Sequence, residues 1–275
     1  MSSRLPFSSM RLLDVATLTS LVSALPRFGR FSYSLSVGST NAQGLERLYH
    51  NDSLGISFVT ESQTEGHGRA GRTWESSAGS GIYVSTILPA ELRASALASV
   101  GFWASLAVRQ ACLESDGVTL ELKWPNDLLW HDRKCVGILA QSRSAGGAAR
   151  VVVGVGINVN RPHQVPDSIA ATACWLSDAA ARELDRTALL GRLLAIYEQT
   201  FDRLLDSPKD IIVQWAEIAA LDGKRVAVKA VDGSLLHEGV IVEVSADGAL
   251  RLRTASGELV RVMLGDVDAL PEGES

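Results

Sequence analysis

The feature that most restricts the fold of this chain is a series of short apolar runs that follows one long alanine-rich segment. The long segment predicts a helix over Ala94–Glu114, which Gly117 would end because glycine readily adopts the left-handed conformation found there. Four short apolar runs come next, and they predict strands at Leu120–Trp124, Leu128–Trp130, Val136–Gln141 and Val151–Ile157. Gly146-Gly147, between the last two runs, is typical of a hairpin turn. Further strands are expected at Phe31–Ser36, Ile56–Thr60 and Ile82–Leu88, and further helices at Thr187–Leu205 and Pro208–Ala219.

The sequence pattern changes near Leu221. From about Asp222, short β-rich runs alternate with turns of the Asp-Gly and Ser-Gly type, which predicts five or so strands in roughly 50 residues, a small barrel or sandwich. At the other end, Asp14 can cap a short helix over Val15–Leu25 that Pro26 ends. The 275 residues therefore divide into an N-terminal tail with a short helix (1–30), a main domain (31–220) and a small β domain (221–275).

Composition excludes several classes of protein. The net charge is −5 and the pI about 5.6, which argues against broad electrostatic binding to nucleic acid. No apolar run reaches the roughly 18 residues of a membrane helix. The three cysteines, Cys112, Cys135 and Cys174, lack CxxC spacing, and apolar residues flank Cys112 and Cys135. They are expected to be buried free thiols, which indicates a reducing compartment, the cytoplasm.

The polar segment Gly66–Arg72 is the first candidate for binding an anion. Its glycines let backbone N–H groups approach phosphate oxygens, and Arg69 and Arg72 offer forked donors. It lacks the ending of a P-loop and the strand-to-helix turn of a dinucleotide site, and a merely solvated loop is an equal alternative. Trp74, directly after it, could stack on a purine or belong to the core.

Two lysines in predicted strands are the next candidates. Leu120 and Leu122 share one face of their strand, so Lys123 shares the other face with Glu121. A lysine that points into a cleft needs a partner or an anion, whereas an exposed edge lysine needs neither. Lys134 opens the next apolar strand, and taken alone a solvated strand end explains it.

Glycines interrupt two of the apolar strands. Gly137 lies in the strand that Lys134 opens, and Gly154 and Gly156 lie in the last strand of the series. Glycine inside a strand leaves room for a flat ligand, with a bulge or close packing as the alternative.

Together, these segments resemble the signature motifs of the biotin protein ligase family. The motifs are Gly38-Ser39-Thr40-Asn41, GHGRAGRTW at Gly66–Trp74, KWPND at Lys123–Asp127, RKCVGIL at Arg133–Leu139, and GVGINVN at Gly154–Asn160. Five motifs in this order over about Val37–Asn160 make the resemblance specific, and the tail resembles the family's SH3-like barrel. The resemblance implies an α/β (α+β) fold. Its catalytic domain has a mixed β-sheet and is related to class II aminoacyl-tRNA synthetases. It also implies a short form without an N-terminal DNA-binding domain.

The resemblance also implies an activity. Such an enzyme activates biotin with ATP as biotinyl-5′-AMP and passes biotin to a lysine of a biotin carboxyl carrier protein. Biotin and ATP are then substrates and Mg²⁺ is the expected companion of ATP, while no metal ligand is assigned. The protein is expected to be a monomer or weak homodimer with no nucleic-acid or membrane partner.

The site residues follow from the motifs. Biotin would contact Ser39, Thr40, Asn41, Gln63, Gly66, His67, Lys134, Gly137 and Gly156. ATP and the adenylate would contact Arg69, Arg72, Trp74, Lys123, Asn126 and Asn158. The catalytic roles fall to Lys134 and Arg69, as fixed cations, and to Asp127, which would orient or deprotonate the acceptor amine or, alternatively, only cap a turn.

Two positions depart from the family pattern. His67 stands where the family loop usually has arginine, and Gln141 stands where an acidic residue is usual. Histidine is mostly neutral at pH 7, so the loop loses one fixed charge and weaker retention of the intermediate is expected.

Three other functions compete with this prediction. A lipoate–protein ligase or octanoyltransferase shares the catalytic fold. A biotin-responsive repressor would need a winged helix, for which too few residues precede Gly38. A biotin-binding protein without catalysis would result if His67 has disabled the loop.

Overall fold

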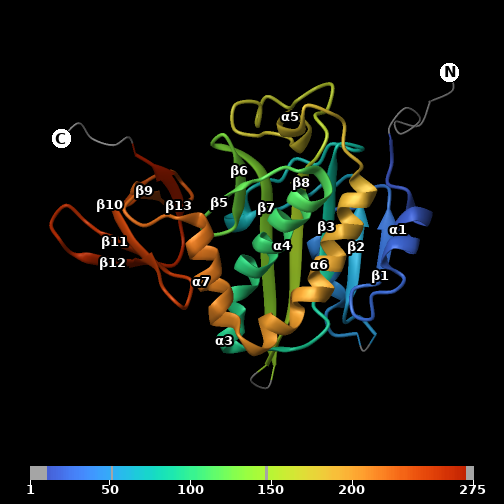
Figure 1. The fold of residues 1–275 in the computed structure, drawn as a ribbon, viewed down its shortest axis with the longest axis horizontal. Helices are drawn as coiled ribbons and strands as arrows, with labels where there is room; N and C mark the ends of the chain where they lie inside the picture. Colours follow the sequence, from blue (N-terminus) through green and yellow to red (C-terminus); the bar gives the residue numbers. More distant parts are fainter. Residues whose placement is uncertain (1–10, 51, 146–147, 271–275) are drawn as a thin grey trace.

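An eight-stranded sheet forms the centre of the computed structural model, which describes residues 11–50, 52–145 and 148–270 (Figure 1). Its strand order is β1-β2-β3-β8-β7-β6-β5, and β4 pairs with β8. β1 and β2 pair in parallel, and the other pairs of described strands are antiparallel, so the predicted mixed sheet is confirmed. The strands are β1 (Arg30–Ser34), β2 (Ile56–Thr60), β3 (Gly81–Ile87), β4 (Leu92–Arg93), β5 (Glu121–Lys123), β6 (Asp127–Trp130), β7 (Arg133–Ala145) and β8 (Ala148–Asn158).

Helices cover one face of this sheet. α4 (Ser99–Asp116) lies across β7 and β8, with α6 (Arg186–Asp206) and α7 (Pro208–Ala219) beside it (Figure 1). The single helix expected over 94–114 is instead α3 (Ala94–Leu97) followed by α4, and Gly117 ends α4 with φ 73° as predicted. The short helices are α1 (Val15–Val22), which packs on α6, and α5 (Leu176–Ala180).

Contrary to the expectation that no apolar run reaches that length, the stretch Ala94–Asp116 is long and apolar enough, by length and composition, to cross a membrane. Of its apolar window, 61% is buried inside the protein, where α4 packs against α6, α7 and the sheet. Burial therefore assigns this helix to the core.

The opposite face of the sheet carries α2 (Thr40–Arg47). Successive residues of a strand point to opposite faces. Val151 and Val153 accordingly pack in the large core, while Val152 packs with Leu48 in a small cluster next to α2. The same alternation places Gly154 and Gly156 on the face of α2, where the sheet is only partly covered.

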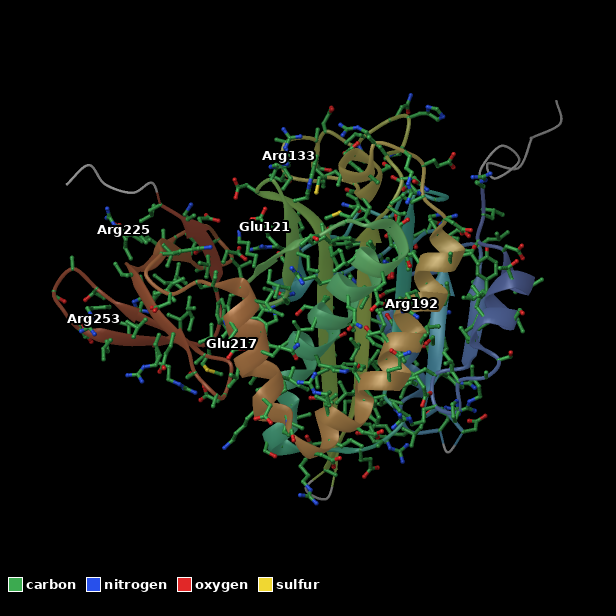
Figure 2. All side chains as sticks on the ribbon, viewed as in Figure 1. Glu121, Arg133, Arg192, Glu217, Arg225 and Arg253 are labelled. Atoms are coloured by element: carbon green, nitrogen blue, oxygen red, sulfur yellow. The ribbon has the colours of Figure 1, made fainter. Side chains whose placement is uncertain are left out.

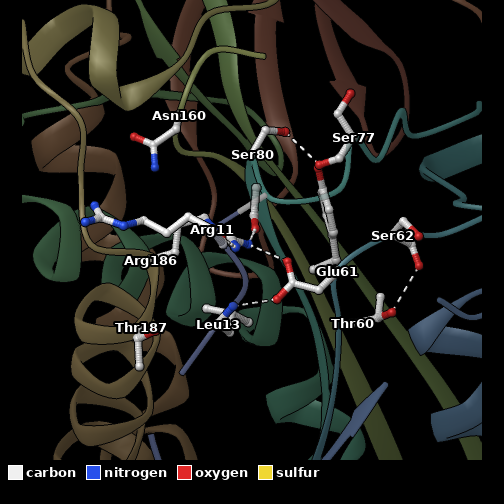
Figure 3. A network of polar contacts seen from close by, with 12 residues as sticks. Arg11, Leu13, Thr60, Glu61, Ser62, Ser77, Ser80, Asn160, Arg186 and Thr187 are labelled. Atoms are coloured by element: carbon white, nitrogen blue, oxygen red, sulfur yellow. Dashed lines mark hydrogen bonds and ion pairs between the residues drawn. The ribbon is translucent and has the colours of Figure 1, made fainter. Parts of the chain in front are cut away.

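A buried ion pair fixes the N-terminal segment to this framework (Figure 3). Glu61, directly after β2, accepts from Arg186 at the start of α6 at 2.9 Å, and the side chains are 0% and 4% exposed. Glu61 also accepts from the backbone N–H of Leu13 at 2.7 Å and from the Tyr33 hydroxyl at 2.9 Å. Burial, and then Glu61, raise the pKa of Tyr33, so its hydroxyl stays protonated and can donate. The network joins three segments at the point where the chain leaves β2 for the glycine-rich loop.

The five strands expected after Leu221 are confirmed. β9 (Arg225–Lys229), β10 (Leu235–Val244), β11 (Leu250–Arg253), β12 (Leu259–Val262) and β13 (Asp266–Ala269) form an antiparallel sheet in the order β12-β11-β10-β9-β13. Figure 2 shows the charged side chains of this sheet, Arg225 and Arg253 among them, projecting outward. The sheet packs on the main body where Trp124 donates to the Gly248 carbonyl at 2.9 Å.

Most element boundaries moved by a few residues. α1 ends three residues before the expected Leu25, and β7 and β8 extend well beyond the predicted runs. The expected hairpin turn at Gly146-Gly147 lies outside the described residues. Cys112, Cys135 and Cys174 are buried free thiols, as predicted.

Candidate functional site

One row of residues crosses four strands on the α2 face of the main sheet. Gly156 in β8 lies opposite Gly137 in β7, Gly137 opposite Asp127 in β6, and Asp127 opposite Lys123 in β5. Directly opposed residues of antiparallel strands share a face. Four positions from three separate motifs therefore meet in a line that the sequence alone does not show.

An irregular pairing brings Lys134 to the same face. Leu128 pairs with Val136, but the next residue, Leu129, pairs with Lys134, so β7 contributes an extra residue there. Such a bulge re-aims the side chains next to it. Lys134 and Gly137 are three positions apart, which would put them on opposite faces of a regular strand, and the bulge places both on the α2 face.

The bulge brings opposite charges together. Lys134 Nζ lies 2.8 Å from Asp127 Oδ1, with side chains 37% and 21% exposed. The contact lacks hydrogen-bond geometry, so Oδ1 is buried without a directed donor. Arg69 reaches the same place from the glycine-rich loop and donates to Asn126 Oδ1 at 3.0 Å. Burial lowers the pKa of Arg69, while the charge of Asp127 acts in the opposite direction. The result is a half-buried cluster of two fixed cations around one carboxylate.

The indole of Trp74 covers the two glycines of the row. A Cβ added at Gly137 would come within 2.7 Å of the Trp74 ring, and one at Gly156 would overlap it. The clearance that the glycines were expected to leave for a flat ligand is thus filled by a flat side chain of the protein itself. Trp74 Nε1 is buried without a hydrogen-bond partner, and Lys134 Nζ lies 5.5 Å from the ring centroid.

A second polar group lies further along the same face. Gln63 Oε1 accepts from the backbone N–H of Thr40 at 2.9 Å, and the Thr40 hydroxyl contacts the Ser85 hydroxyl at 2.7 Å. Asn41 donates to Gln141 at 2.7 Å, while its Oδ1 is buried next to Gly154 without a partner. Unsatisfied buried polar atoms are uncommon, and three of them, on Asn41, Trp74 and Asp127, line the face that carries the charge cluster.

Comparisons with known proteins agree with this geometry. Residues 33–158 match the model of the biotin/lipoate A/B protein ligase family, and residues 223–269 match that of the biotin protein ligase C-terminal domain. The biotin–[acetyl-CoA-carboxylase] ligase of Mycobacterium tuberculosis is 30% identical over 239 residues, 84% of this chain and 85% of that protein. This chain belongs to the biotin protein ligase family.

Other members of the family support the assignment. The bifunctional ligase/repressor BirA of Bacillus subtilis is 29% identical over 235 residues, 84% of this chain and 71% of that protein. A solved structure of the biotin protein ligase of Aquifex aeolicus with biotin and ATP has a TM-score of 0.72 and 25% identity, and covers 88% of this chain and 99% of that one. The predicted family and fold class are therefore confirmed.

The motif Gly38–Asn41 leads into a helix. α2 begins at Thr40, and Ser39 is its N-cap, with its hydroxyl 3.4 Å from the Ala42 N–H. Ser and Thr strongly favour this position because the side chain accepts from the first turn. The Ser39 hydroxyl therefore caps the helix as an acceptor, and the polar atoms that contact the sheet come from Thr40 and Asn41.

Two predicted nucleotide-binding cations lie at the edge of the site. Lys123 Nζ is 3.4 Å from Asp268, and Arg72 pairs with Asp266, so both contact the C-terminal sheet. The remaining predicted residues are near the row: His67 is exposed in the loop and bridges to Thr73, Gly66 is buried under the Trp74 carbonyl, and Asn158 is buried at the end of β8.

Several residues that support the candidate site escaped prediction. Ser85, Ser76 and the buried pair Glu61–Arg186 hold Thr40, Gln63 and the start of the loop. Serine in a buried strand was the one available signal, because β3 is buried throughout and yet carries Ser85.

Gly156→Ala tests the close packing against Trp74. The new methyl would overlap the indole, so we expect the free energy of unfolding to fall by about 1–3 kcal/mol. The measurements are a lower melting temperature and a shifted tryptophan emission. Gly101→Ala is the matched control, because a Cβ there meets nothing within 4 Å and alanine favours its helix by about 1 kcal/mol. Equal melting temperatures for Gly156→Ala and wild type would show that Trp74 does not lie on Gly156.

Proposed function

We propose that this protein joins biotin to the side chain of a lysine on a biotin carboxyl carrier protein, through biotinyl-5′-AMP. The observation that carries the proposal is the cluster of Lys134, Arg69 and Asp127 beside the glycine row, in a chain of the biotin protein ligase family. Both halves of the reaction place negative charge where this cluster lies.

The first half-reaction joins two anions. A carboxylate oxygen of biotin attacks the α-phosphorus of ATP, the bond to the β-phosphate oxygen breaks, and pyrophosphate leaves with the bonding electrons. Fixed cations and N–H groups lower the barrier by stabilising the charge that spreads over the phosphoryl oxygens. We assign this role to Lys134 and Arg69, the two cations of the cluster.

Trp74 and the loop must move for this to happen. The indole occupies the clearance over Gly137 and Gly156, so a ligand that uses the clearance displaces it. We propose that biotin or the adenine takes that place and that the loop then closes over the adenylate. Closure excludes water, which would otherwise hydrolyse the mixed anhydride.

The second half-reaction transfers the acyl group. The neutral amine of the acceptor lysine attacks the anhydride carbonyl, AMP leaves, and the proton of the amine is released. A free lysine with a pKa near 10.4 is mostly protonated at pH 7, so its ammonium needs a carboxylate that orients it and accepts a proton. Asp127 is the carboxylate in the cluster, and we assign it this role.

Mg²⁺ fits this arrangement as a companion of ATP. It binds mostly through substrate phosphates with one or two carboxylates, and no group of three or more metal-ligating side chains exists in the described part of the chain. Asp127 is the carboxylate of the cluster, and it is the protein ligand we would assign to the ion. When bound, the ion would neutralise phosphate charge.

A single-turnover experiment tests the proposed function. Enzyme, ATP and labelled biotin should yield biotinyl-AMP and then a labelled carrier domain, whereas binding without transfer would indicate a protein without catalysis. Thermal shifts with biotin or lipoate, each with ATP, separate the ligand classes, and we expect stabilisation by biotin of about 3–4 kcal/mol at 100–1,000 times its Kd. Stabilisation by lipoate alone would overturn the assignment.

A further inference from the structure

The C-terminal sheet holds the glycine-rich loop through an ion pair. Asp266 of β13 pairs with Arg72, the last residue of the loop turn, across 194 positions of sequence. β13 lies at one edge of its sheet. Asp268, two residues on and on the same side of the strand, pairs with Lys123 at 3.4 Å and with Lys229 of β9 at 3.0 Å. One edge strand thus contacts two cations of the main body.

Holding Arg72 also holds the rest of the loop turn. The Gly68 N–H donates to the Arg72 carbonyl at 2.6 Å, and the Arg72 N–H donates to Arg69 at 3.2 Å. The other end of the turn is fastened by the bond from Arg69 to Asn126. The loop is therefore fastened on two sides in this structure, once to the cluster and once to the C-terminal sheet.

The two contacts that hold the loop differ in strength. Arg69 is half-buried, whereas the side chains of Arg72 and Asp266 are 47% and 38% exposed. Ion pairs in water contribute little, a factor of about two to five in an equilibrium constant. The Arg72–Asp266 ion pair is thus the contact that a competing anion can break.

We propose that Asp266 is a positioning residue that acts as a latch. It holds the Arg72 guanidinium in the empty protein, and the phosphates of ATP compete with it for that guanidinium. This rests on the proposed function, because the resemblance places Arg72 at the nucleotide. Binding of ATP then releases the loop from the C-terminal sheet and couples the position of that sheet to occupancy of the site.

The test compares Asp266→Asn with Glu243→Gln. Glu243 pairs with Arg251 at 3.0 Å, is similarly exposed, and lies in the same sheet away from the loop, so its variant has the same change in charge. Binding of α,β-methylene-ATP in the presence of biotin is measured by calorimetry, because the methylene bridge between its α- and β-phosphates prevents transfer of the adenylyl group to biotin. We expect Asp266→Asn to bind it about two- to five-fold more tightly, since the competitor is gone, and Glu243→Gln to match wild type.

A second readout follows the loop itself. Trypsin should cleave after Arg69 and Arg72 faster in empty Asp266→Asn than in empty wild type, with the peptides identified by mass spectrometry. Biotin and the analogue together should protect both proteins equally. In an Arg72→Ala background, Asp266→Asn should no longer change the affinity for the analogue.

Each outcome decides the proposal. Unchanged or weaker binding of the analogue by Asp266→Asn would mean that Asp266 does not compete with the nucleotide for Arg72. The proposed latch would then be wrong. An unchanged rate of loop cleavage in the empty variant would also refute it. Failure of wild type to bind the analogue would instead count against the proposed function, and the cleavage rates of the empty proteins would still test the contact.

Discussion

Lys134→Ala should reduce the formation of biotinyl-AMP by at least about 10²–10³-fold, the loss that follows removal of one charge-stabilising donor. The bulge in β7 places its side chain with Nζ 2.8 Å from Asp127 and Cε next to Gly137, where the attacking carboxylate and the α-phosphate would meet. Both partners of the ion pair are partly exposed, so the fold should survive. Pyrophosphate release in the presence of biotin and ATP is the direct measurement.

The Lys134 result needs a control for charge and for folding. Lys224→Ala removes the same charge at an exposed turn before β9 and should release pyrophosphate at the wild-type rate. Melting temperatures of both variants should stay close to wild type. Near-normal pyrophosphate release by Lys134→Ala would show that Lys134 does not stabilise charge in the first half-reaction.

Glu61→Gln should be the most destabilising single change at the network of Figure 3. It would leave the Arg186 guanidinium, 4% exposed, without its counter-charge, and breaking a buried pair in this way costs about 3–5 kcal/mol. At about 2–4 °C per kcal/mol, the melting temperature should fall by roughly 10 °C. Thermal and urea unfolding measure this directly.

The surface pair of Glu238 and Arg225 supplies the comparison. Its side chains are 49% and 46% exposed, so Glu238→Gln should cost less than about 1 kcal/mol. The double variant Glu61→Gln/Arg186→Met should recover part of the lost stability, because it removes the uncompensated charge while the introduced amide oxygen can still accept from the Leu13 N–H. A melting temperature for Glu61→Gln within 2 °C of wild type would correspond to a loss on the order of 1 kcal/mol in the free energy of unfolding, and it would contradict the prediction.

The loss of stability in Glu61→Gln should also affect binding at the candidate site. Glu61 lies two residues before Gln63, whose amide holds Thr40 through its oxygen and Ser76 through its nitrogen. We therefore expect the Glu61→Gln variant to bind biotin more weakly even at temperatures where it is folded.

Local patterns determined much of this protein in advance. Alternating apolar residues and turn signals predicted the strands of the main sheet except β4 and the number of strands in the C-terminal sheet, with β2 and α7 located to the residue. Five ordered motifs sufficed for the family. These succeed because side-chain direction along a strand and the ends of helices depend on neighbours a few positions apart.

The tertiary structure alone decided how the motifs combine. The line from Gly156 through Gly137 and Asp127 to Lys123 depends on strand register, and the direction of Lys134 depends on a bulge that no single strand shows. Trp74 on the glycines, Glu61 with Arg186, and Asp266 with Arg72 join residues far apart in the chain. The sequence determined which groups could do the chemistry, whereas their positions depend on packing and cross-strand pairing between distant segments, which local preferences do not encode.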